Sequence, residues 1–159
     1  MHISFSENGN WKECLFHAYS FRFTETPVFT QLSDCITTTV NPSHREGFDN
    51  ISLLSNEHFG LGVTATLRSA FDDVGCPEII LVPETEQCDD GAVRYGACFE
   101  IIPWKNGINV WELWQDESET VRIRNLLELK TPLQTGQLHD FSLRITKDRF
   151  AVQLDDLSF

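Results

Sequence analysis

Positive charge is scarce in this sequence. It has 12 Lys and Arg residues against 24 Asp and Glu, which gives a formal net charge of −12 at pH 7. Nucleic acids and anionic membrane surfaces attract a basic face on their partner, so we expect neither as a partner. The excess of acid is better suited to solubility, or to a polar or cationic partner.

Long apolar runs are also missing. No stretch approaches the ~20 apolar residues that span a bilayer, and Met1–Asn8 has neither the basic nor the apolar region of a secretory signal. The five cysteines are odd in number and scattered, without a C-x-x-C pair. They favour free thiols in a reducing compartment over a disulfide framework or zinc knuckle. We therefore expect a cytoplasmic location.

Common catalytic signatures are absent as well. The five histidines show no H-x-H or H-E-x-x-H spacing, and there is no G-x-S-x-G elbow. Gly60–Ala65 matches G-x-G-x-x-A, but it opens an expected strand rather than the helix that would hold a pyrophosphate. The sequence gives no basis for metal-dependent hydrolysis, serine catalysis or dinucleotide binding.

What the sequence does contain is alternation of apolar and polar residues, the pattern of half-buried strands. A helix is expected only as a turn near Asn56–Phe59. Asn106-Gly107 and Lys147-Asp148 are expected to close hairpins. Strands are expected at 14–23, 28–40, 63–71, 78–82, 95–102, 108–114, 121–129, 141–146 and 150–154.

About ten short strands separated by turn residues favour a sandwich or a barrel, because an open sheet of that size usually splits into two layers. A chain of 159 residues without a linker or repeat is the size of one domain. We therefore predict an all-β, two-layer antiparallel β-sandwich that forms a single domain over residues 1–159.

The segment from Phe48 to Leu154 resembles a concanavalin A-like lectin/glucanase domain. The resemblance is carried by Asn50–Leu54, Pro77–Val82, Arg94–Gly96 with Phe99–Ile102, Asn106–Trp111 and the hairpin Phe141–Leu154. It implies a jelly-roll sandwich and a carbohydrate-binding, lectin-like function on its concave face. Such domains usually add a final strand after that hairpin, so either the N-terminal segment fills the position or the sandwich lacks its last strand.

Glycoside hydrolases of this fold carry Glu-x-Asp-x-x-Glu or Glu-x-Asp-x-Glu on one strand, and this sequence has neither. Glu112 and Asp116 would lie roughly 13 Å apart on a strand, whereas retaining chemistry needs about 5–5.5 Å. The classical retaining mechanism is not expected. An unrecognised carboxylate pair, such as Glu78 with Glu100, is the enzymatic alternative.

A polar and aromatic face is the stronger candidate for a site. Sugar recognition combines an aromatic plate with planar hydrogen-bonding groups. The ligand-binding candidates that the strand pattern supplies are Arg68, Glu78, Glu100, Asn109 and Trp111. The structural alternative is that Trp111 serves packing and that Arg68 and Glu100 form a cross-strand ion pair.

No cofactor is expected, although calcium is a further candidate. The pairs Asp72-Asp73, Asp89-Asp90 and Asp155-Asp156 offer oxygen ligands, but none has the spacing of an EF-hand loop. Acidic pairs in turns are more often solvated. A third functional alternative is a non-catalytic interaction scaffold. The oligomeric state is left open, with a homodimer among the alternatives.

Overall fold

The computed structural model describes residues 1–20, 29–38, 52–72 and 75–158. These residues form fourteen strands and one helix of four residues, α1 (Trp11–Cys14). The chain divides into two compact units, which we call unit 1 (1–58 and 84–96) and unit 2 (59–83 and 97–159). The all-β prediction is thereby confirmed, whereas one domain over 1–159 stays a prediction.

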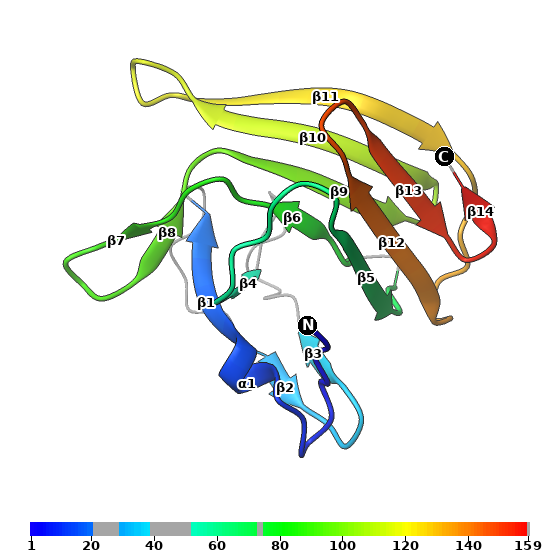
Figure 1. The fold of residues 1–159 in the computed structure, drawn as a ribbon. Helices are drawn as coiled ribbons and strands as arrows, with labels where there is room; N and C mark the ends of the chain where they lie inside the picture. Colours follow the sequence, from blue (N-terminus) through cyan, green and yellow to red (C-terminus); the bar gives the residue numbers. More distant parts are fainter. Residues whose placement is uncertain (21–28, 39–51, 73–74, 159) are drawn as a thin grey trace. The chain divides into compact units, whose positions relative to one another are not determined.

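Unit 1 contains a four-stranded sheet and a separate hairpin (Figure 1). In the sheet, β1 pairs antiparallel with β4 and parallel with β8. The sheet order is β4 (Ser52–Ser55), β1 (Leu15–Ser20), β8 (Val93–Tyr95) and β7 (Glu86–Gln87), and the hairpin is β2 (Phe29–Gln31) with β3 (Ile36–Thr38).

Alternation along β1 gives this sheet one buried face. Ala18, Ser20 and Tyr95 are buried, and the hydroxyls of Tyr95 and Ser52 lie 2.7 Å apart in a hydrogen bond between β8 and β4. Because successive side chains of a strand point to opposite faces, His17 and Tyr19 lie on the other face.

Unit 2 contains two four-stranded sheets, whose neighbouring strands are all antiparallel. The first, which we call the β10 sheet, has the order β11 (Val121–Lys130), β10 (Gly107–Gln115), β9 (Cys98–Trp104) and β6 (Ile79–Leu81). The second, the β12 sheet, has the order β14 (Leu157–Ser158), β13 (Phe150–Leu154), β12 (His139–Ile145) and β5 (Thr64–Ser69).

The two sheets of unit 2 share one hydrophobic core. Its buried members come from β9 and β10 on one side and from β12 and β13 on the other: Ile101, Ile108, Val110, Phe141, Leu143, Val152 and Leu154. Along β10, β12 and β13 they recur at every second residue, which is the alternation found in the sequence. One face of each sheet therefore points into the core, and the other face points away from it.

Two local predictions were wrong. The strand expected at 28–40 is the β2–β3 hairpin in its described part, where the Leu32 N–H donates to the Cys35 carbonyl 2.9 Å away. The helix expected near Asn56–Phe59 is a bend, in which the Asn56 side chain donates to the Glu13 carbonyl. The Ser55 hydroxyl also accepts from the Glu57 N–H 3.0 Å away, and local side-chain to backbone hydrogen bonds of this kind compete with helix formation.

No helix within the described residues has the length and the apolar character needed to cross a membrane.

Candidate functional site

Three of the predicted ligand-binding residues lie on the face of the β10 sheet that points away from the core. Ile101, Ile108 and Val110 point into the core, so their neighbours Glu100, Asn109 and Trp111 point the other way. Trp111 on β10 lies directly opposite Glu100 on β9, and Asn109 lies opposite Ile102. We call this the Trp111 face.

Exposure differs sharply across the Trp111 face. Glu100 is only 5% exposed, whereas Asn109 and Trp111 are both half-buried. The Asn109 Oδ1 atom is buried and has no hydrogen-bond partner among the described residues. A buried acceptor without a partner costs about 1–3 kcal/mol. Of the three residues, Trp111 and the part of Asn109 outside this buried oxygen are therefore the ones that a ligand could reach.

Glu78 lies just before the strand that neighbours Glu100. It immediately precedes β6, in which Ile80 lies opposite Glu100. Removal from water, followed by the negative charges of Glu78 and Glu100, raises the pKa of the Cys76 thiol to about 12. The structure thus brings both carboxylates near one thiol.

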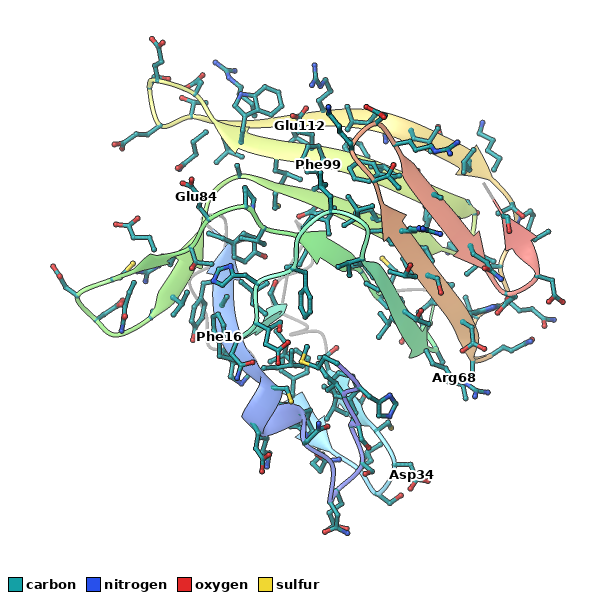
Figure 2. The ribbon with its side chains drawn as sticks, viewed as in Figure 1. Phe16, Asp34, Arg68, Glu84, Phe99 and Glu112 are labelled. Carbon is teal, nitrogen blue, oxygen red and sulfur yellow. The ribbon has the colours of Figure 1, made fainter. Side chains whose placement is uncertain are left out.

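Arg68 does not belong to this group. It lies on β5 (Figure 2), opposite Asp140 of β12, and forms an exposed ion pair with it at 3.7 Å. Its neighbour Leu67 lies opposite the core residue Phe141, so Arg68 points away from the core on the β12 sheet. Alternation placed Arg68 on the polar side of its strand, but it could not say which sheet that strand joins.

The comparisons with known proteins give no family. No protein-family model, curated protein or solved structure matches the chain. The likeness to concanavalin A-like domains therefore stays a prediction, and the site is argued from its geometry.

One member of each acidic pair considered for calcium is engaged in a protein contact, and for Asp72 this is the Gly75 N–H, which it accepts at 2.9 Å. Asp90 accepts from the Ala92 N–H and from Arg94, and Asp155 accepts from the Asp140 N–H and is bonded to His139. Asp73 lies outside the described residues. In the part of the chain that the structure describes, no group of three His, Cys, Asp or Glu side chains could hold a metal ion.

A second group of residues was missed by the sequence analysis. In unit 1, a hollow of about 480 Å³ is lined by Phe16, His17 and Tyr19 of β1 and by residues 90–93. We call it the Tyr19 hollow. Two signals in the sequence pointed towards it: the alternation of His17 and Tyr19, and the Asp89-Asp90-Gly91 turn. Nothing local, however, indicated that β1 pairs with a strand more than seventy residues further along the chain.

Proposed function

We propose that this chain is a non-catalytic carbohydrate-binding protein that uses the Trp111 face. We further propose that unit 2 is a two-layer β-sandwich of the concanavalin A-like type. The shared core between two four-stranded antiparallel sheets supports the proposed architecture. The observation that carries the function is the half-buried Trp111 next to the Asn109 amide, whose oxygen has no partner among the described residues.

The chemistry of this pair suits a sugar. The apolar face of a pyranose ring can stack on an indole, and the ring hydroxyls need planar donors and acceptors at its edge. The Asn109 amide carries both kinds of group, but its oxygen is buried, so a ligand hydroxyl would bond to that oxygen only after a rotation of the side chain. Glu100 lies directly opposite Trp111 and is almost fully buried. We therefore assign Glu100 to the support of the indole rather than to ligand contact.

The test is a glycan array followed by titration calorimetry with the best sugar. Trp111→Ala is expected to weaken binding at least about tenfold, because a central aromatic anchor commonly contributes 2 kcal/mol or more. Trp111→Phe keeps an aromatic plate and should retain most of the affinity. The matched control is Trp114→Ala, on the same strand but on the opposite face, opposite Arg122. It should leave the affinity unchanged.

Two results would contradict the proposal: no sugar bound by the folded wild-type protein, or equal losses for Trp111→Ala and Trp114→Ala. The same sugars, offered as chromogenic glycosides, examine the enzymatic alternative. If the wild type hydrolyses one of them and both Glu100→Gln and Glu78→Gln lose this activity, the site is catalytic rather than only ligand-binding.

A second candidate function is contact with another protein chain. Strand β11 is an edge of the β10 sheet, and Ile123, Leu126 and Leu127 on it are 41–50% exposed. With Val110, Phe150 and Val152, the two leucines line an apolar groove of about 290 Å³. Exposed apolar patches and edge strands mark interaction surfaces. A light-scattering mass above that of the monomer, reduced by Leu127→Lys, would support this function.

A further inference from the structure

We propose that the Tyr19 hollow in unit 1 is a second binding site for a neutral sugar ring. The class of ligand rests on the proposed function, but the location and the residues do not. Tyr19 would supply the stacking surface, and the paired side chains of Asp90 and Arg94 would supply the groups that bind neighbouring hydroxyls.

The sheet of unit 1 places an aromatic ring next to charged groups on one face. Tyr19 on β1 lies opposite Arg94 on the parallel strand β8, and Arg94 lies opposite Glu86 on β7. Partners in register have their side chains on the same face. The three residues therefore form a row across three strands, and His17 lies on the same face two residues before Tyr19.

Asp90 is held in place at the edge of this row. Its Oδ1 accepts the Ala92 N–H at 2.9 Å, and its Oδ2 accepts from Arg94 Nη2 at 2.9 Å. These hydrogen bonds also keep the pKa of Asp90 below its ordinary value. A carboxylate has about four lone-pair positions, so each oxygen can still accept from a ligand hydroxyl.

The strands that form the base of the hollow are packed on their other face. On the opposite face of the same strands, Ala18, Ser20 and Tyr95 are buried, and Tyr95 is hydrogen-bonded to Ser52 across the sheet. Phe16, labelled on β1 in Figure 2, also lines the hollow, although alternation along β1 puts it on the face of Ala18 and Ser20. The volume of about 480 Å³ lies within the range of roughly 300–1,000 Å³ that is typical of small-molecule sites.

The ion pair between Asp90 and Arg94 favours a neutral polyol over an ion at this point of the hollow, and Glu86, opposite Arg94, adds a negative charge beside it. Asp90 and Arg94 already neutralise each other at 2.9 Å, so a cationic ligand would compete with Arg94 and an anionic one would be repelled by Asp90. A sugar can donate one hydroxyl to the carboxylate and accept from the guanidinium with the next. Arg94 is outside the lining of the hollow, but it lies opposite Tyr19 and its side chain is 39% exposed, so its donors face a ligand at the rim.

The test is a titration of the ¹⁵N-labelled chain, followed by NMR, with the methyl glycosides of glucose, mannose, galactose and N-acetylglucosamine. One of them is expected to shift the amide signals of Tyr19, Gly91 and Ala92 in a saturable way. Asp90→Asn and Tyr19→Ala should each weaken this binding at least about tenfold. The matched control Asp89→Asn, which changes an adjacent exposed carboxylate outside the lining, should not.

The two proposed sites give separable results. If the hollow binds sugar, Trp111→Ala leaves the titration of the Tyr19 and Ala92 signals unchanged. Sugar-induced shifts that occur only around Trp111 and are unaffected by Asp90→Asn would contradict a sugar site in the Tyr19 hollow. They would leave the proposed function of the Trp111 face intact. Shifts at the hollow caused by methylammonium but by none of the glycosides would overturn the ligand class. Asp90→Asn is a mild change at an exposed position, so the test does not depend on the Tyr19 variant folding.

Discussion

Gly107→Ala is expected to lower the free energy of unfolding by at least about 3 kcal/mol, because the structure leaves no room for a side chain there. Gly107 begins β10 with φ +143°, a conformation that residues with a Cβ rarely adopt. A Cβ would overlap the carbonyl oxygen of Leu129 and lie 2.9 Å from the Thr131 amide nitrogen. Both atoms are backbone, so only a shift of the neighbouring chain could relieve the overlap.

Denaturant unfolding, followed by far-UV circular dichroism, measures this loss. The matched control is Gly60→Ala, also in unit 2, where a Cβ would meet no atom within 4 Å. Gly60→Ala should change the free energy of unfolding by no more than about 0.5 kcal/mol. Equal stabilities of the two variants would show that the close approach of β10 to Leu129 is not maintained in solution.

Gly107 also shows what the sequence could predict. Asn106-Gly107 between two alternating segments is a strong local signal for a hairpin, and β9 and β10 pair across it. Lys147-Asp148 predicted the β12–β13 hairpin equally well. Likewise, the alternation along β10 correctly put Asn109 and Trp111 on one face and Ile108 and Val110 on the other. Each of these features is decided by residues close together in the chain.

Features that join distant segments could not be predicted in this way. The parallel pairing of β1 with β8 joins two segments that are far apart in the sequence. No turn residues near either strand indicate this pairing. The partner of Arg68 depends on which sheet receives β5. The extra residue in β11 opposite Val110 and Trp111, a β-bulge, left Leu126 and Leu127 both lining the same groove. Strict alternation predicts the opposite for two successive residues.

His139→Ala is expected to lower the free energy of unfolding by about 2 kcal/mol at pH 6. The imidazole is almost fully buried. Its Nδ1 lies 2.7 Å from Asp155 Oδ2, and its Nε2 lies 2.8 Å from the carbonyl oxygen of Gln134. Both partners accept but cannot donate when Asp155 is ionised, so both are satisfied only by the protonated ring.

The structural role of His139 is to link the start of β12 to two loops. It joins the start of β12 to the segment before it, through Gln134, and to the β13–β14 turn, through Asp155 with φ +50°. The Asp155 side chain is 44% exposed, so water weakens the ion pair itself. We therefore assign most of the 2 kcal/mol to the two hydrogen bonds of the charged ring and to its contact with Phe71.

The contribution of His139 depends on pH in a defined direction. Burial alone would lower the pKa of the ring, but the hydrogen bonds to Asp155 and to the Gln134 carbonyl outweigh it, and the pKa is raised. The resulting stability is fully present below the ordinary value of about 6.5 and is lost as the pH rises through the folded-state pKa. Asp155 has its pKa lowered by His139 and by the Asp140 N–H. Its contribution is present above its ordinary value of about 3.9 and is lost as the pH falls through the folded-state pKa.

The interaction should therefore contribute most between about pH 4 and 6.5. Unfolding free energies measured at pH 6 and pH 9 test this expectation. The difference in the free energy of unfolding between wild type and His139→Ala should be smaller at pH 9 than at pH 6, because the His139 ring of the wild type loses its charge as the pH rises. His58→Ala, which removes an exposed histidine, should follow the wild type at both values. A gap that is the same at pH 6 and pH 9 would show that His139 contributes through packing alone, and that its two acceptors do not require the proton.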